Sequence, residues 1–301
     1  MYHGWRYDGT GQCVEQPGED EGPAARVKIA SYPVEEYLGL IFAYLGEGDP
    51  PPIRRFPDFE RDFVIETGVP EAWPCNYFNR LDNAADRNHV MWTHRESLSR
   101  TGGSATMRPI WGEETEYGAR TATTMPDGSV TYTHFHMPNI NQTRSSSRVE
   151  GALSDTGTGL DRLFWRVPVD DEHSISFIVD CVHLSGEAAE SYRERRRQSA
   201  ETTNTELLNG VGEAVLAGKM RVRDMDATWS TYKTFWIEDY AVQCGQVAIA
   251  DRSNERPIRI DAGMLFLRKL WERELLKVAT GRPIKRWTTP AGLAEMPSMR
   301  A

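Results

Sequence analysis

The sequence predicts an α+β fold, in which an antiparallel sheet is covered by helices. Two observations lead to this prediction. Segments with the length and composition of strands follow one another in the middle of the chain, and helical segments flank them instead of alternating with them. The predicted strands are residues 116–124, 129–136, 162–169 and 174–184, and the predicted helices are residues 76–97, 187–220 and 264–278.

The N-terminal part of the chain contains short strands and turns. Glycines at residues 8–11 indicate a tight turn, and the apolar run at residues 37–44 predicts a buried strand. The run Asp49-Pro50-Pro51-Pro52 favours extended backbone. We therefore place a domain junction there, which divides the chain into residues 1–48 and 49–301.

Two further patterns predict how the later elements are buried. In the strand at 174–184, apolar residues at 175, 177, 179 and 181 alternate with polar residues at 174, 176 and 180, as expected for a half-buried antiparallel strand. The last helix carries an apolar stripe that predicts core packing, made of Leu265, Leu267, Leu270, Trp271 and Leu275. Small and polar residues indicate a turn at 126–128 and a loop at 151–159.

Composition excludes several classes of protein. The chain has 301 residues, of which 39% are hydrophobic and 26% are charged, values typical of a soluble globular protein. A formal charge of −9 argues against nucleic-acid binding. The longest apolar run, residues 38–46, is too short to span a membrane, and no signal peptide is expected. The four cysteines show no paired spacing, which favours a reducing cytoplasm over disulfides or a zinc site.

Residues 82–94 are the most informative segment, because they place Asn83, Asp86, His89 and His94 close together. Two imidazoles and a carboxylate on one face of a ferrous ion are typical of mononuclear oxygenase sites. Histidines five residues apart on a regular helix are separated by about 500°, so their rings point roughly 140° apart. Both reach one metal only if the helix ends or bulges between them. The alternative is an amphipathic helix with two histidines at its polar edge.

The first residues, Met1-Tyr2-His3-Gly4-Trp5, resemble the second half of the Rieske motif Cys-x-x-His-Gly-Trp. Together with the histidine segment, they resemble the large (α) subunit of Rieske non-haem iron aromatic-ring oxygenases. Residues 32–46, 75–83 and 236–261 extend the resemblance along the chain. It is strongest to the branch with phthalate dioxygenases and vanillate-type O-demethylases.

The resemblance implies a fold and two iron centres. The expected fold is the C-terminal remnant of a Rieske β domain followed by a helix-grip catalytic domain. His89, His94 and Asp239 would hold the mononuclear Fe(II), and His3 would be a ligand of the Rieske [2Fe–2S] cluster. The family pattern puts the second cysteine of the cluster one place before Met1 and the remaining pair further upstream. The [2Fe–2S] cluster is therefore not expected to be completable by this chain alone, and we expect that an internal methionine was taken as the start of a longer reading frame.

The resemblance also implies the reaction. Oxygen from O2 would be inserted into an aromatic substrate, by ring dihydroxylation or O-demethylation of an aromatic acid. Electrons would come from NAD(P)H through a reductase or ferredoxin and the Rieske cluster of a neighbouring subunit in a homotrimer. Asp86 would bridge His89 to His3 of that neighbouring subunit and orient both rings.

Other histidines and a basic cluster allow more than one interpretation. His134 and His136 are two apart on a strand and share a face. They are candidates for the substrate pocket, for the metal pair of a β-barrel dioxygenase, or for ordinary histidines of a sheet surface. His173 and His183 are expected to be structural. The arginines between residues 193 and 197 form either a solvated helix face or a docking face for an acidic electron donor.

Three functions therefore stay open from sequence alone. The first is an oxygenase catalytic subunit. The second is non-catalytic: a truncated remnant, or a helix-grip module that binds an apolar ligand without iron. The third is a stand-alone dioxygenase with two histidines and one carboxylate, which would turn over without a reductase.

Overall fold

The structure is a computed structural model that describes residues 3–18, 26–100, 107–124, 128, 130–145, 159–198, 205–225 and 231–289. The chain divides into two compact units, Met1–Arg54 and Arg55–Ala301. The division lies a few residues beyond the junction placed at residue 48. The predicted turn at 126–128 and loop at 151–159 fall mostly outside the described residues.

The first unit consists of two small hairpins. Strand β1 (Arg6–Tyr7) pairs with β2 (Cys13–Glu15), and β3 (Val34–Tyr37) pairs with β4 (Leu40–Ala43), both antiparallel. The tight turn predicted at residues 8–11 is present: the Gly11 N–H donates to the Asp8 carbonyl at 3.0 Å.

The buried strand predicted at residues 37–44 is wrong. Leu38 and Gly39 both have positive φ, of 52° and 73°, and turn the chain back on itself within the apolar run. Such a pair of residues forms the two-residue turn that matches the twist of a hairpin. Ile41 is 77% exposed in the described chain. Hydrophobicity alone did not reveal that a turn interrupts the run.

The second unit contains one eight-stranded sheet. Its strands are β5 (Val64–Thr67), β6 (Glu71–Trp73), β7 (Ile110–Glu114), β8 (Gly118–Thr124), β9 (Val130–His136), β10 (Ile140–Ser145), β11 (Leu160–Pro168) and β12 (Ser174–Val182). The order is β5-β12-β11-β10-β9-β8-β7, and β6 also pairs with β12. Every pairing is antiparallel, which confirms the predicted sheet.

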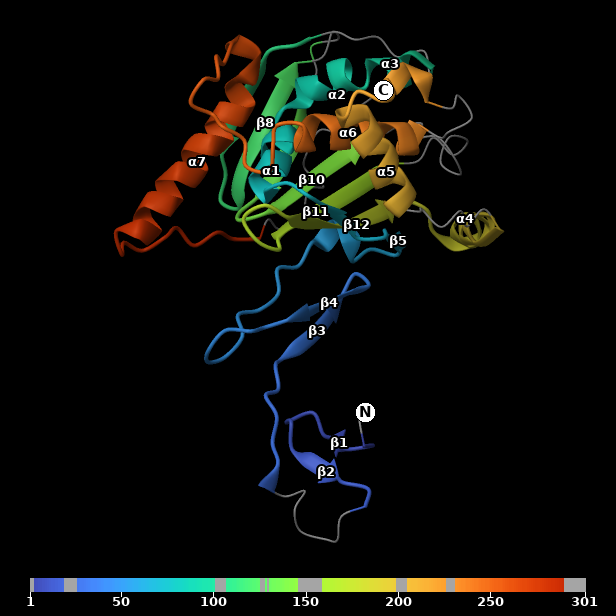
Figure 1. Ribbon diagram of the computed structural model, residues 1–301, viewed down its shortest axis with the longest axis vertical. Helices are drawn as coiled ribbons and strands as arrows, with labels where there is room; N and C mark the ends of the chain where they lie inside the picture. Colours follow the sequence, from blue (N-terminus) through green and yellow to red (C-terminus); the bar gives the residue numbers. More distant parts are fainter. Residues whose placement is uncertain are drawn as a thin grey trace. The chain divides into compact units, whose positions relative to one another are not determined.

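Seven α-helices lie among the described residues: α1 (Tyr77–Ala85), α2 (Arg87–Thr93), α3 (Arg95–Arg100), α4 (Gly186–Gln198), α5 (Thr205–Leu216), α6 (Thr231–Cys244) and α7 (Ala262–Ala279). Figure 1 shows α1, α5 and α6 across one face of the sheet and α7 beside β8. None of the described helices combines the length and apolar character of a membrane span.

The segment predicted to be helical at 76–97 consists of three short helices, with breaks at Asp86 and His94. The helix predicted at 187–220 corresponds to α4 and α5, and α5 ends at Leu216, just before Gly218 takes a φ of 68°. Left-handed glycine commonly ends a helix.

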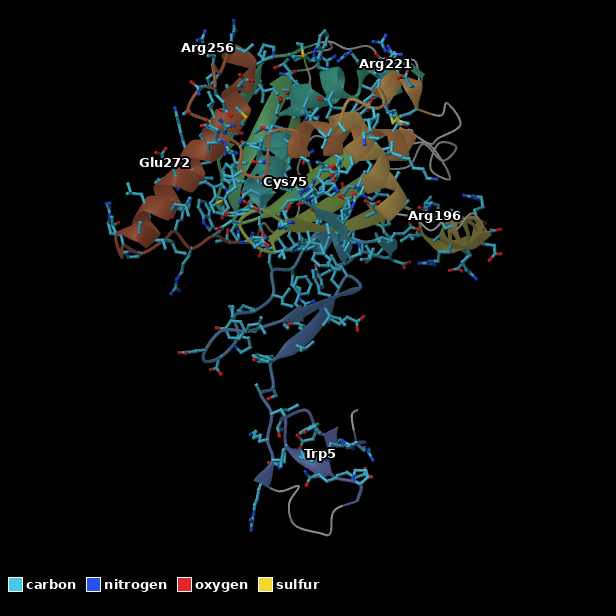
Figure 2. All side chains as sticks on the ribbon, viewed as in Figure 1. Trp5, Cys75, Arg196, Arg221, Arg256 and Glu272 are labelled. Atoms are coloured by element: carbon cyan, nitrogen blue, oxygen red, sulfur yellow. The ribbon has the colours of Figure 1, made fainter. Side chains whose placement is uncertain are left out.

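The core lies between the helices and the sheet. Leu81 and Ala85 of α1 pack with Leu267, Leu270 and Trp271 of α7, as the apolar stripe predicts. At the end of the stripe, however, Leu275 is 53% exposed. A second cluster joins α5 and α6 to the strand that precedes α1, and contains Trp73, Cys75, Leu208, Trp236, Ile237 and Tyr240. Figure 2 shows charged side chains such as Arg196 and Glu272 at the periphery of this unit and Cys75 inside it.

The alternation predicted for β12 is reversed in its first half. Ser174 and Ser176 are 1% and 0% exposed, whereas Ile175 and Phe177 are only partly buried. The face beneath the helices is polar here, because Arg166 donates to Ser176 Oγ at 2.6 Å. A buried salt bridge of 2.7 Å between Arg80 and Glu71 lies in the same region. Buried polar groups need such partners, so Ser176 faces inward, and Ser174 lies on the same face two residues earlier.

Candidate metal centre

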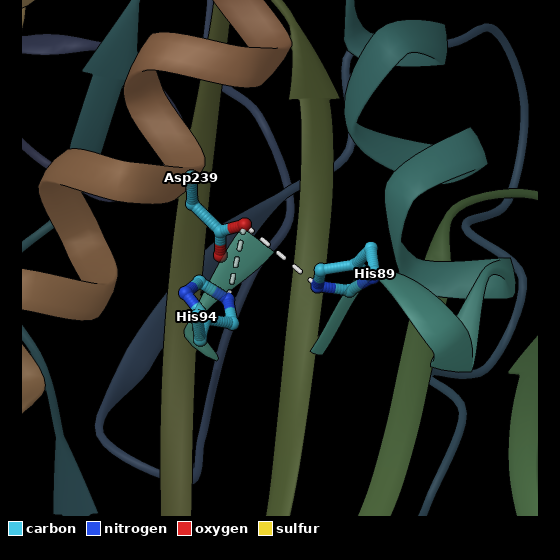
Figure 3. A group of neighbouring side chains, drawn as sticks. All are labelled: His89, His94 and Asp239. Carbon is cyan, nitrogen blue, oxygen red and sulfur yellow. Dashed lines mark ion pairs between the residues drawn. The ribbon is translucent and has the colours of Figure 1, made fainter. Parts of the chain in front are cut away.

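Three predicted ligands lie together in the second unit (Figure 3). His89 belongs to α2, His94 follows its last residue, and Asp239 lies on α6. Asp239 Oδ1 is 3.7 Å from His89 Nε2 and 3.5 Å from His94 Nε2. One ligand atom of each residue lies within 4.8 Å of the others. Two imidazole nitrogens and one carboxylate oxygen therefore face a common point.

The helix break at His94 makes this convergence possible. Helix α2 ends at Thr93, and His94 has φ −92° and ψ 17°, outside the regular helix. The His89 and His94 ring centroids are 5.5 Å apart. The spacing of five residues required the helix to end or bulge between the histidines, and the helix does end there.

Each histidine uses its Nδ1 atom for another contact. His94 Nδ1 is 2.8 Å from Glu238 Oε2, and the ring stacks on Phe235 with centroids 4.2 Å apart. Ser97 Oγ donates to the same Glu238 oxygen at 2.9 Å. His89 Nδ1 contacts the backbone carbonyl of Asp86. Both rings are thus turned so that Nε2 points toward Asp239.

Asn83 is also part of this cluster. Its Nδ2 lies 3.2 Å from His89 Nε2 and donates to Asp239 Oδ1 at 3.3 Å. In the structure its amide touches two of the three candidate ligand atoms.

Electrostatics in the site favour a charged pair. Burial disfavours the imidazolium of His94, but hydrogen bonds with Asp239 and Glu238 outweigh it and raise the pKa of His94 to about 9. Burial also disfavours ionised Asp239, but the hydrogen bond with His94 and the charge of His89 outweigh it and lower the pKa of Asp239 to about 2. A divalent cation would have to displace the proton on His94 Nε2.

Asp86 links the two helices that carry the site residues. It ends α1 and caps α2, where its Oδ1 accepts from the Asn88 N–H at 2.9 Å. Burial raises the pKa of Asp86, and the charge of His89 opposes this shift. The capping contact is a structural role that the sequence did not predict. The predicted bridge to a neighbouring subunit stays a prediction.

His134 and His136 point away from the helices. Thr133 Oγ1 accepts from Arg87 of α2 at 2.7 Å, and neighbouring strand residues point to opposite faces. His134 is 2.6 Å from the Tyr117 hydroxyl, and His136 Nε2 is 2.8 Å from Gln142 Oε1. At 3% and 0% exposure they are not histidines of a sheet surface. The prediction that they bind substrate draws no support from this placement.

The other candidate residues make contacts of their own or belong to the first unit. His3 belongs to the first unit, is exposed and has a φ of 71°. His183 pairs with Asp161 at 3.0 Å, as expected of a structural histidine, and His173 pairs with Asp170 on the surface. In the basic cluster, ion pairs join Arg193, Arg196 and Arg197 to Glu190, Glu66 and Glu194.

A small cavity lies between α1, α7 and strands β8–β10. Its lining mixes apolar and polar side chains: Ala84, Ala85, Ala119, Thr121, Thr133, Phe135, Asn141 and Leu267. Thr121 Oγ1 and Asn141 Oδ1 are buried and have no hydrogen-bond partner among the described residues. Ala84 directly follows Asn83, so the cavity borders the segment that carries the metal cluster.

The sequence did not indicate Glu238 and Ser97 as site residues. Ser97 comes three residues after His94, and Glu238 directly precedes Asp239. Both were visible beside the predicted ligands, but only the fold brings Glu238 to a histidine that lies 144 residues earlier.

No protein-family model matches the chain. Curated relatives match it over most of its length. The oxygenase subunit of 5,5'-dehydrodivanillate O-demethylase from Sphingobium sp. (strain NBRC 103272 / SYK-6) is 27% identical over 94% of this chain. The α subunit of phenoxybenzoate dioxygenase from Ectopseudomonas oleovorans is 25% identical over 93% of this chain and 66% of the relative.

The chain is a homologue of Rieske oxygenase subunits. Solved structures of NdmB and NdmA from Pseudomonas putida CBB5 share its fold, with TM-scores of 0.57 and 0.56 at 18% identity; both matches cover 93% of this chain and 71% of the other. The chain spans 62% of the O-demethylase subunit and 61% of a tert-butanol monooxygenase subunit from Aquincola tertiaricarbonis.

Proposed function

We propose that His89, His94 and Asp239 hold a mononuclear ferrous ion, and that the chain is the catalytic part of an oxygenase component. The observation that carries this proposal is the convergence of two Nε2 atoms and one carboxylate oxygen within 4.8 Å. The donor set suits the metal, because two imidazoles and one carboxylate bind non-haem Fe(II) and leave positions open.

A ferrous ion bound there would supply the reductive activation of dioxygen. The residues of the chain would hold the ion and surround it. His89 and His94 present Nε2, while their Nδ1 atoms are engaged elsewhere. Asp239 contributes a carboxylate that stays ionised across the physiological range because its pKa is about 2. Asn83 contributes an amide donor beside the ligand atoms.

We infer that the substrate is an aromatic acid, converted by ring dihydroxylation or by O-demethylation. The names of two relatives, a dehydrodivanillate O-demethylase and a phenoxybenzoate dioxygenase, support this substrate class.

In this proposal electrons reach the iron from NAD(P)H through a reductase or ferredoxin and a Rieske [2Fe–2S] cluster. His3 would be a ligand of that cluster, and Asp86 would carry the connection to His89 between subunits of a homotrimer in the cytoplasm. His3 and Asp86 belong to different units of the chain, so the connection requires an assembly that includes both units.

The proposal is tested by measuring iron and acid-labile sulfide per chain. Both are measured on wild type, Asp239→Ala and Asp224→Ala. Asp224 is an exposed aspartate paired with Arg221, and serves as the matched control. We expect about one mononuclear iron in wild type and in Asp224→Ala, and loss of iron in Asp239→Ala, because a carboxylate ligand is removed.

A folded wild-type protein without iron would contradict the proposal and favour a helix-grip module that binds an apolar ligand. Oxygen uptake separates the remaining alternatives. In an assembly that contains the complete [2Fe–2S] cluster, uptake that depends on NAD(P)H and a reductase fits the oxygenase component, whereas substrate turnover without a reductase would favour a stand-alone dioxygenase.

A further inference from the structure

Two consecutive carboxylates of α6 contact the two nitrogens of one imidazole. Asp239 Oδ1 lies 3.5 Å from His94 Nε2, and Glu238 Oε2 lies 2.8 Å from His94 Nδ1. Neighbouring helix residues diverge by about 100°, so one carboxylate reaches each side of the ring. Helix α6 therefore supplies a candidate ligand and also fixes the orientation of another.

Glu238 is itself held in place. It is 2% exposed, and Ser97 Oγ donates to Oε2 at 2.9 Å, the same oxygen that contacts His94. Its other oxygen, Oε1, has no hydrogen-bond partner among the described residues. Phe235, one turn earlier on α6, stacks on the His94 ring at an interplanar angle of 14°. The carboxylate and the ring thus have little freedom to rotate.

The second histidine is arranged differently. His89 Nδ1 contacts a backbone carbonyl, that of Asp86, rather than a carboxylate. An anionic acceptor makes a stronger hydrogen bond than a neutral one. It also makes the imidazole a more basic, and therefore better, ligand for the metal. The two imidazoles are therefore not equivalent, and His94 is the one supported by charge.

We propose that Glu238, supported by Ser97, is a positioning residue that holds the Nδ1–H of His94 and keeps Nε2 directed at the metal. This inference rests on the proposed function, because it concerns the same metal centre. Glu238 itself binds no metal in this proposal. Its contribution is to fix the angle of the ring and, once a metal has displaced the Nε2 proton, to keep the remaining proton on Nδ1.

Metal affinity provides the first test. Anaerobic Fe(II) is titrated against a competing chelator into the full chain and its variants. Glu238→Leu removes the acceptor, and we expect a loss of affinity of about 10- to 100-fold. In Glu238→Gln the amide oxygen still accepts from Nδ1–H, so the loss should be smaller. Ser97→Ala should have the smallest effect, because the carboxylate remains.

The matched control is Glu274→Leu. Glu274 of α7 is likewise buried, at 5% exposure, and accepts from Lys277 and the Lys285 backbone, away from the candidate ligands. Its loss should lower stability without changing Fe(II) affinity. A general effect of removing a buried glutamate would appear in both variants.

A spectroscopic readout separates positioning from a merely structural role. In Zn(II)-loaded protein with ¹⁵N-labelled histidine, a His94 Nδ1–H held by Glu238 should give a slowly exchanging proton resonance. The resonance should persist in Glu238→Gln and disappear in Glu238→Leu, while the corresponding His89 signal stays unchanged.

The outcomes distinguish the two proposals. Tight metal binding by wild type, with unchanged affinity and an intact resonance in Glu238→Leu, would overturn the positioning role and leave the metal centre standing. Absence of Fe(II) and Zn(II) binding by wild type would overturn both. A graded loss in the order Leu, Gln, then Ser97→Ala supports the role of Glu238.

Discussion

The neutral amide of Asn83 lies against two candidate ligand atoms, so introducing a charge at this position should change metal binding. Asn83→Asp would put an anionic oxygen about where Nδ2 now lies, 3.2–3.3 Å from His89 Nε2 and Asp239 Oδ1. Because divalent cations bind more tightly as anionic oxygen ligands are added, we expect Fe(II) affinity to rise by about tenfold.

The measurement is the anaerobic Fe(II) titration with chelator competition, and Asn83→Leu is the control of similar size without a polar group. The control should bind Fe(II) no more tightly than wild type. If Asn83→Asp behaved like Asn83→Leu, position 83 would not border the metal.

Asp86 combines two roles that one pair of substitutions separates. Its side chain caps α2 through the Asn88 N–H, and asparagine caps a helix about as well as aspartate. We expect Asp86→Asn to keep the stability of wild type, and Asp86→Ala to lose about 1 kcal/mol. In an assembly that contains the complete [2Fe–2S] cluster, both variants should lose reductase-driven oxygen uptake if the carboxylate carries the predicted connection to the cluster.

Denaturant unfolding and oxygen uptake measure the two roles independently. Full oxygen uptake by Asp86→Asn would rule out the bridging role, whereas wild-type stability of Asp86→Ala would rule out the cap.

Single residues were predictable where chemistry and local spacing coincide. Asn83, Asp86, His89 and His94 fall within one segment, and the need for a helix break followed from the spacing of the histidines. Contacts across long sequence separations were not predictable in this way. The Glu238 carboxylate meets His94 only because α6 packs against the segment that contains α2 and α3.

At the scale of elements, Glu274 holds the segment that follows α7 against the helix by hydrogen bonds. It accepts from the Lys285 backbone N–H at 3.0 Å and from Lys277 and Arg273 on its own helix. Burial opposes ionisation, but these donors outweigh it and lower the pKa of Glu274 to about 2. A carboxyl with a lowered pKa stabilises the fold above its unfolded-state pKa, near 4.5, and this contribution is lost as pH falls toward 2.

We therefore expect Glu274→Gln to unfold more easily at pH 7, by roughly 1 to 2 kcal/mol. The difference from wild type should shrink as the pH is lowered from about 4.5 to 2, because wild type then loses the same charge. Denaturant unfolding across this pH range measures it. A difference that stays constant with pH would show that the charge of Glu274 is not responsible.

Elements were predicted well where a pattern was long and poorly where an interruption was local. Strands β8, β9, β11 and β12 match the predicted segments closely. The hairpin of β3 and β4 was missed because Leu38 adopts a left-handed turn that apolar residues rarely take. The inward-facing Ser176 of β12 depends on Arg166, which comes from the neighbouring strand β11.

At the scale of the whole molecule, the chain forms two units, and the candidate metal centre belongs to one of them. His89, His94, Asp239, Asn83 and Glu238 all come from Arg55–Ala301, whereas His3 comes from Met1–Arg54. The class of fold was predictable from the order of segments. The strand order was not, because β5 pairs with β12 across more than a hundred residues of intervening chain.

This division predicts that mononuclear metal binding does not require the first unit. A variant that begins at Arg55 keeps every candidate donor, the helices that carry them and the core clusters behind α1 and α6. We expect it to bind Fe(II) with an affinity within about threefold of that of the full chain, since removing groups outside a site changes binding little. Parallel Fe(II) titrations compare the affinities of the two proteins, and circular dichroism shows whether both are folded. A folded variant that binds no Fe(II) would mean that the first unit contributes to the mononuclear centre itself, and the assignment of three ligands from one unit would then be incomplete.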